Sequence, residues 1–215
     1  GGQPIARIGV ELAADEVAGG VVYLDHVTWD GVPDVTLTRP AEGGTMWRRA
    51  WVNGVDRFDE HSPEPYRLVQ NSGAGLLVQG SRGWTDYEVG APVRLHMAES
   101  AGIGARVQGM RRYYALLLCR GGKARLVKAL DGEAVLAEAD FSWQFDLTYD
   151  LRLTVQGNRL RASIDGEEVF DVEDEDQPLT GGAVALVCEE GRAESELVRV
   201  RPLGGGSGQE VAGRR

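Results

Sequence analysis

The stretch GARVQGMRRYYALLLC, residues 104–119, decides the fold of this chain. Apolar and polar residues alternate through it, and Gly109 interrupts the alternation where a turn is expected. Two more stretches repeat the pattern, LRLTVQGNRLRASIDG at residues 151–166 and GAVALVC at residues 182–188. Short strands at regular spacing, separated by turn residues, are typical of a β-sandwich or barrel. We therefore expect an all-β fold, a two-sheet antiparallel jelly-roll sandwich.

Composition narrows the classes of protein to which the chain can belong. Its 215 residues are enough for one large sandwich. The hydrophobic fraction of 42% and the charged fraction of 26% are typical of a folded domain. No apolar run is long enough to span a bilayer. The net charge of -10 disfavours nucleic acid and anionic lipid as partners, because phosphate contacts need a basic surface.

The alternation also predicts individual strands and the residues they bury. We expect strands over residues 66–70, 75–80, 86–97, 103–110, 112–120, 123–130, 133–138, 148–156, 159–165, 167–172, 182–188 and 194–201. The residues expected in the core are Leu116, Leu118, Leu151, Leu153, Val155, Leu160, Ala162, Ile164, Val184 and Leu186. Cys119 and Cys188 each fall within a strand. They can pair only if their strands are neighbours, and free, buried thiols are the favoured interpretation.

The N-terminal part is organised differently from the rest. Residues 1–40 are expected to form a β-hairpin, with strands at 5–12 and 21–29, and this hairpin could be the tail of a preceding sandwich. Residues 41–65 have the composition of a linker or loop, although 46–52 fits either a helical turn or a short strand. The sandwich should span residues 66–203, and residues 204–215 are expected to be a flexible tail. The chain starts at Gly1 and not at Met, which suggests a fragment of a longer protein and leaves its localisation undetermined.

The order and spacing of several motifs carry a resemblance to a known fold family. These motifs are GWTDYEV at 83–89, RYYALLL at 112–118, LVK at 126–128, YDLRL at 149–153, RASIDG at 161–166 and GGAVAL at 181–186. Together they resemble the concanavalin A-like, laminin G-like jelly-roll modules of bacterial multidomain proteins. The resemblance covers roughly residues 66 to 203 and implies a fold with broad faces that can bind ligands.

A narrower resemblance rests on three other segments. They are VYLDHVTWDG at 22–31, MWRRAWVNG at 46–54 and GMRRYY at 109–114. They resemble the region after the catalytic domain in some bacterial ADP-ribosylglycohydrolase-family proteins. The hydrolase domain of that family is all-helical and binds magnesium through paired acidic residues, and no helical segment of that size is present here. The resemblance implies an accessory module, with a catalytic domain elsewhere in the same parent chain.

Several polar and aromatic residues are candidates for a sugar-binding groove. Jelly rolls bind sugars by stacking aromatic rings on sugar faces and by placing planar polar groups at the hydroxyls. The candidate ligand-binding residues are Trp84, Arg106, Gln108, Arg112, Tyr114 and Lys128, with Arg111, Tyr113 and Trp143 beside them. A second interpretation stays open, in which the aromatic residues are half-buried packing and the charged residues lie on an ordinary solvated sheet face.

Signals for catalysis, metal binding or a cofactor are weak. Glycoside hydrolysis needs two carboxylates that face each other across the bond, and no Glu-x-Asp-x-Glu or similar run is present. His26, His61 and His96 are scattered without metal-ligand spacing. The acidic run at 171–176 fits a solvated charge cluster better than a calcium loop, because it lacks the spacing of an EF-hand. We therefore expect no catalytic residue, no metal site and no cofactor in this chain.

These observations favour a non-catalytic accessory module that binds carbohydrate or another sugar-bearing ligand. One alternative is a glycoside hydrolase of the same fold with divergent acidic residues. Another is a structural spacer or protein-interaction domain. Binding of a glycan without turnover would favour the accessory module. Cleavage of the glycan would favour the hydrolase, and the lack of any ligand would favour the spacer or interaction domain.

Overall fold

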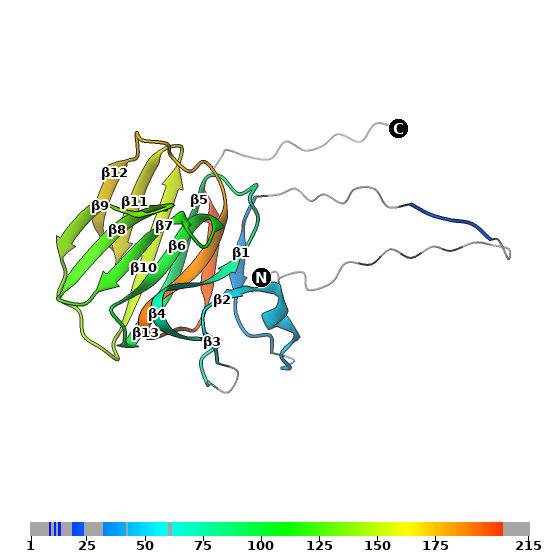
Figure 1. The fold of residues 1–215 in the computed structure, drawn as a ribbon, viewed down its shortest axis with the longest axis horizontal. Helices are drawn as coiled ribbons and strands as arrows, with labels where there is room; N and C mark the ends of the chain where they lie inside the picture. The colour runs from blue at the N-terminus through cyan, green and yellow to red at the C-terminus, as the bar shows by residue number, and fades with distance from the viewer. Residues whose placement is uncertain are drawn as a thin grey trace.

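The computed structural model describes residues 9, 11, 13, 19–23, 32–41, 43–59 and 62–203, and the strands among them form an antiparallel β-sandwich (Figure 1). One short 3-10 helix, η1 at Met46–Ala50, lies among the strands. The strands are β1 Val35–Leu37, β2 Val52–Gly54, β3 Arg57–Phe58, β4 Tyr66–Gln79, β5 Tyr87–Met97, β6 Ser100–Gly109, β7 Arg112–Cys119, β8 Lys123–Leu130, β9 Glu133–Asp140, β10 Thr148–Gln156, β11 Arg159–Ile164, β12 Glu167–Glu173, β13 Ala183–Ser195 and β14 Val198–Pro202. The expected all-β jelly-roll class is therefore confirmed.

The strands form a hydrogen-bonded path that folds back on itself. The path runs in the order β12-β11-β10-β5-β13-β6-β7-β8-β9, and β4 and β14 join it through β13 and β5. Strand β10 lies across β6 and β7, and the two ends of the path, β12 and β9, also contact each other. The two halves of the path therefore form two facing layers (Figure 1).

Two long strands connect these layers, and here the expected boundaries differ from the structure. The strands expected at 66–70 and 75–80 form one strand, β4, and β13 continues past residue 188 to Ser195. A bulge between Glu189 and Gly191 bends β13, so that its first part pairs with β6 and its last part with β5. Alternation alone does not show such a bend, because one inserted residue disturbs the period only locally.

The main core lies between the layers and contains every residue expected there. The expected core residues, from Leu116 to Leu186, are all 2% exposed or less and belong to one apolar cluster. Each contributes from one face of its strand, as the alternation predicts. The assignment of strand faces from the sequence is confirmed for β7, β10, β11 and β13.

A second apolar cluster covers the opposite face of the layer that contains β6, β7 and β8. Strand β7 contributes Ala115, Leu117 and Cys119 to it, whereas Leu116 and Leu118 point into the main core. Strand β7 is thus buried on both faces, which explains its nearly continuous apolar run. Cys119 belongs to the second cluster and Cys188 to the main core, and both thiols are free, as expected.

Residues 43–59 differ from the linker expected over 41–65. Helix η1 and strands β2 and β3 pack onto β4, and Trp47, Trp51 and Phe58 are buried around Tyr66. The ring centroids of Trp51 and Tyr66 lie 4.9 Å apart, and those of Trp47 and Tyr66 lie 5.6 Å apart. The ambiguous stretch at 46–52 forms a helical turn that leads into a strand. Widely spaced aromatic residues anchor this segment, although glycine and charged residues dominate its composition.

The expected N-terminal hairpin, with strands at 5–12 and 21–29, and the expected tail at 204–215 lie outside the described residues, apart from a few positions of the hairpin. In the described part of the chain, no helix has the length and apolar character that crossing a membrane requires.

Candidate functional site

Arg106 was expected on an exposed face of its strand, and the structure corrects this. Its side chain is 1% exposed and points into the sandwich. The backbone of Arg106 is left-handed, with φ +50°, at an irregularity in the pairing of β6 with β7. This bulge places Ala105 and Arg106 on the core side and Val107 in the second cluster, so the alternation is broken at one residue.

The buried guanidinium of Arg106 is satisfied by the protein itself. Its Nε donates to the carbonyl of Thr85, and Nη1 donates to the carbonyls of Gly157 and Leu179. Nη2 pairs with Asp86 at 3.1 Å. Burial lowers the pKa of Arg106, and the nearby carboxylate of Asp86 opposes this shift. Arg106 therefore holds loops together and offers no free group to a ligand.

Tyr114 and Lys128 are buried in the same way, against the segment that follows β12. The Tyr114 hydroxyl donates to Asp174 Oδ2 at 2.5 Å and accepts from the N–H of Leu179 at 2.8 Å. Lys128 Nζ lies 2.7 Å from Asp174 Oδ2 and donates to the carbonyl of Asp176. Burial is the main reason that the pKa of Tyr114 is raised. The prediction that Arg106, Tyr114 and Lys128 line an open groove is therefore wrong, since all three tie the end of the sandwich together.

Two carboxylates of the acidic run at 171–176, those of Asp171 and Asp174, take part in internal contacts. Asp174 is buried between Tyr114 and Lys128, and Asp171 pairs with Arg159 at 2.5 Å. Within the described stretches, no group of three or more His, Cys, Asp or Glu side chains is arranged to hold a metal ion. His96 lies between Asp146 and Glu194, and His26 and His61 lie outside the described residues.

Gln108 and Arg112 do meet in an open hollow, which we call the arginine pocket. It is lined by Arg82, Thr85, Gln108, Arg112, Thr180 and Gly181 and has a volume of about 380 Å³. Trp84 does not line it, because its ring lies against Gly80 and contacts Tyr87 edge-on at 6.2 Å. Two of the six predicted ligand-binding residues are thus brought together at the surface.

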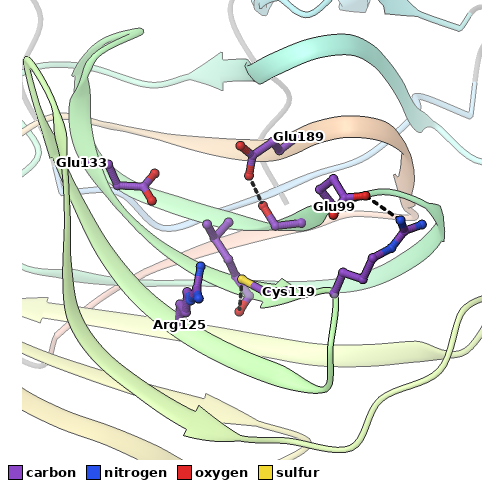
Figure 2. A pocket seen from close by; sticks show the side chains of 8 residues that line it. Glu99, Cys119, Arg125, Glu133 and Glu189 are labelled. Carbon is purple, nitrogen blue, oxygen red and sulfur yellow. Dashed lines mark hydrogen bonds and ion pairs between the residues drawn. The ribbon is translucent and has the colours of Figure 1, made fainter.

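A second hollow, the carboxylate pocket, lies at the other end of β6 and β7. It is lined by Glu99, Ser100, Leu117, Cys119, Arg120, Arg125, Glu133 and Glu189 and has a volume of about 150 Å³. Figure 2 shows Cys119 in the middle, with Glu99, Arg125, Glu133 and Glu189 around it. Glu189 accepts a hydrogen bond from Ser100 at 2.8 Å, and Glu99 pairs with Arg120 at 2.6 Å. Arg125 pairs with Glu138 at 2.7 Å.

The electrostatics of the carboxylate pocket keep its thiol protonated at neutral pH. Burial raises the pKa of Cys119 to about 11, and the carboxylates of Glu133 and Glu189 add to the rise while Arg125 opposes it. Tyr113 responds in the same direction, because burial and the same two carboxylates raise its pKa to about 12. A thiolate is needed for nucleophilic attack. Cys119 is therefore part of the apolar floor of the pocket.

A third hollow, the aromatic pocket, adjoins the carboxylate pocket at Arg120. It is lined by Arg120, Gly121, Gly122, Trp143, Gln144 and Phe145 and has a volume of about 410 Å³. Trp143 and Phe145 meet edge-on with ring centroids 5.0 Å apart, and Phe145 is 38% exposed. Trp143 Nε1 donates to the carbonyl of Cys119 at 2.8 Å, which fixes the indole beside the turn between β7 and β8. The pocket therefore offers aromatic surface and the guanidinium of Arg120 side by side.

The single groove expected from the sequence is thus divided between two ends of the molecule. Trp143 lies at the Cys119 end of β7, and Gln108 and Arg112 lie at the opposite end. Most residues of the carboxylate and aromatic pockets were missed, namely Glu99, Ser100, Arg120, Glu133, Gln144, Phe145 and Glu189. A usable signal was present in Trp143-Gln-Phe145, since two aromatic residues in a loop without strand pairing often face a ligand.

Comparison with solved structures identifies the fold more closely. The carbohydrate-binding module CBM66 from Bacillus subtilis matches with a TM-score of 0.64 and 15% identity, over 71% of this chain and 95% of that chain. A Bacillus subtilis protein of unknown function with a galectin-like fold matches with a TM-score of 0.55 and 14% identity, over 74% and 92%. The carbohydrate recognition domain of Emp47p matches with a TM-score of 0.50 and 15% identity, over 71% and 88%. At identities this low, the matches show a shared fold alone, the jelly-roll sandwich.

The comparisons of sequence add no closer relative. No family model matches the chain, and no curated protein matches it. Nothing among the matches links the chain to ADP-ribosylglycohydrolase-family proteins, so that narrower resemblance stays a prediction.

Proposed function

We propose that this chain is a carbohydrate-binding module and that its sugar site is formed by the adjoining aromatic and carboxylate pockets. The observation that carries the proposal is the pair Trp143 and Phe145, which line an open hollow next to the ion pair of Arg120 and Glu99. Aromatic rings stack on the apolar faces of sugars, and planar charged groups bind their hydroxyls. The fold shared with carbohydrate-binding modules supports the same conclusion.

The module acts as an accessory to a larger protein. Its resemblance at residues 22–31, 46–54 and 109–114 to the accessory region of ADP-ribosylglycohydrolase-family proteins supports a catalytic domain in the same parent chain. The partner of this chain is then a carbohydrate or a sugar-bearing small molecule, and binding brings the catalytic domain to its substrate.

A glycan array followed by calorimetry tests the proposal. Phe145→Ala should weaken binding of the best glycan about tenfold, because removing an aromatic side chain from the centre of an interface typically costs more than about 1 kcal/mol. The matched control is Met46→Ala, since Met46 is 48% exposed and lies on η1, away from both pockets. Equal binding by the two variants would place the sugar elsewhere, and no bound glycan on a broad array would favour a structural spacer.

A glycoside hydrolase is the second candidate, because Glu133 and Glu189 line the same pocket. Carboxylates on two sides of a bond are what glycoside hydrolysis requires. If the bound glycan releases reducing ends, and Glu133→Gln and Glu189→Gln both stop that release, the hydrolase is correct. Binding that persists without release supports the non-catalytic module.

A further inference from the structure

The arginine pocket lies far along β6 from the proposed sugar site and has a different chemistry. Strand β6 begins at Ser100, in the carboxylate pocket, and reaches Gln108, in the arginine pocket. The arginine pocket holds about 380 Å³, and none of its six lining residues carries a carboxylate. Its polar groups are two guanidiniums, two hydroxyls and one amide.

Among the described residues, none pairs a carboxylate with the two arginines of this pocket. The guanidinium of Arg82 donates to the backbone carbonyl of Gln108 at 3.3 Å, and the guanidinium of Arg112 forms no hydrogen bond or ion pair with any described residue. The neighbouring carboxylate of Asp86 is already held by Arg106 and by the N–H of Gly157. Other arginines of this acidic chain do hold carboxylates, among them Arg120, Arg125, Arg152 and Arg159. Two guanidiniums in one hollow, neither paired with a carboxylate of the described residues, favour an anionic ligand.

The wall of the pocket is rigid because backbone segments approach closely. A Cβ on Gly181 would lie 2.9 Å from the carbonyl oxygen of Arg82 and 3.0 Å from that of Trp84. Gly182 N–H donates to the carbonyl of Trp84 at 2.9 Å, and Gln108 Nε2 donates to the carbonyl of Gly181 at 2.8 Å. The loops before β5 and β13 and the end of β6 are therefore held together before any ligand arrives, which reduces the entropy lost on binding.

We propose that the arginine pocket binds the carboxylate of an acidic saccharide, a uronic acid. A guanidinium donates two parallel hydrogen bonds to the oxygens of a carboxylate, and this geometry distinguishes a planar carboxylate from a neutral hydroxymethyl group. The hydroxyls of Thr85 and Thr180 and the amide oxygen of Gln108 are available for the ring hydroxyls. The saccharide part of this inference rests on the proposed function, whereas the anionic part rests on the pocket itself.

Nuclear magnetic resonance titration of the ¹⁵N-labelled full chain tests this inference. The probes are sodium D-galacturonate and sodium D-glucuronate, with methyl α-D-galactopyranoside and methyl α-D-glucopyranoside as neutral counterparts. We expect saturable amide shifts at Thr85, Thr180 and Gly181 with at least one uronate and not with the neutral sugars. Arg112→Gln and Arg82→Gln should each raise the Kd about tenfold, since each removes a charge-assisted contact.

The matched control is Arg161→Gln, which removes the same charge from an exposed arginine of β11. It should bind the uronate as the wild type does. The inference is overturned if neither uronate shifts these amides, if neutral and acidic sugars act alike, or if Arg112→Gln binds as tightly as Arg161→Gln. Sodium acetate with the same Kd as the uronate would overturn the saccharide assignment. Because Phe145→Ala lies at the other end of the molecule, loss of glycan binding in that variant and loss of uronate binding in Arg112→Gln are independent results.

Discussion

The backbone N–H of Arg106 donates a hydrogen bond to the phenolic oxygen of Tyr87 at 2.6 Å. The Tyr87 hydroxyl in turn shares its single hydrogen between the carbonyl oxygens of Gly182 and Ala183, at 2.9 and 3.0 Å. One buried phenol thus holds the bulge of β6 against the start of β13. The bulge is what turns the Arg106 side chain inward, so this contact determines which groups are left at the surface of the arginine pocket.

Tyr87→Phe should lower the free energy of unfolding by about 1–3 kcal/mol. The substitution leaves the buried N–H of Arg106 and a buried carbonyl without their partner, and an unsatisfied buried group costs about that much. Urea denaturation measures the change. Tyr149→Phe is the control. The Tyr149 hydroxyl accepts a hydrogen bond from the backbone N–H of Gln144 near the surface, so the loss of this hydroxyl should cost less. Equal costs would show that the bulge does not depend on Tyr87.

Lys128→Met should destabilise the protein by about 3–5 kcal/mol, because it leaves the buried charge of Asp174 unpaired. The double variant Lys128→Met/Asp174→Asn should recover part of this loss, since the uncompensated charge is removed. A double-mutant cycle with urea denaturation measures the coupling. Additive effects would mean that the two side chains stabilise the protein independently.

Leu153→Ala should cost roughly 2–5 kcal/mol, as a large-to-small change at a fully buried site. Val52→Ala is the comparison, because Val52 is 66% exposed and surface changes usually stay within about 0.5 kcal/mol. The change in the free energy of unfolding of each variant is measured from the midpoint of its urea unfolding curve. A small effect at Leu153 would contradict its place in the core.

Stability should fall steeply as the pH rises above about 9. Burial raises the pKa of Cys119 to about 11 and that of Cys188 to about 12, from a usual value of 9.0, and burial also raises the pKa of Tyr113 to about 12. Burial likewise raises the pKa of Tyr66, Tyr87 and Tyr114. Above these usual values the unfolded chain has lost protons that the folded chain keeps, so the free energy of unfolding decreases with pH.

Thermal unfolding monitored by circular dichroism between pH 7 and pH 11 would show this decrease as a falling Tm. In the variant Cys119→Ala/Cys188→Ala, the onset should move upward toward pH 10, because only the tyrosines then contribute. A Tm that is flat to pH 11 would contradict the burial of these groups.

Much of the fold was predictable because its strands obey a period of two. The core positions of β10 and β11, such as Leu153 and Leu160, follow from alternation alone. The packing of residues 43–59 was not predictable, because Trp47, Trp51 and Phe58 are separated by residues of linker composition. Their common partner, Tyr66, is contacted only after the chain turns back.

The site was less predictable than the fold, and Arg106 shows why. A single residue with left-handed backbone, Arg106, reverses the face of the sheet on which the following side chains lie. No local sequence pattern predicts such a residue. Lys128 was misjudged for another reason, since its carboxylate partner Asp174 is distant in sequence and comes close only through the packing of the loop after β12. Gln108 and Arg112 both line the arginine pocket, because they flank the turn between β6 and β7.

The two cysteines lie where their reactivity toward a thiol reagent would report local opening of the structure. Cys119 and Cys188 belong to different apolar clusters, on opposite faces of one layer. Cys119 is 6% exposed at the floor of the carboxylate pocket and Cys188 is fully buried, so fast labelling of either sulfur by a thiol reagent requires the surrounding side chains to move. Cys119 would therefore signal loosening of the outer cluster beneath the carboxylate pocket, while Cys188 would signal separation of the two layers. Labelling rates at these two natural cysteines would show, without any introduced residue, whether a bound ligand stabilises one face or the whole sandwich.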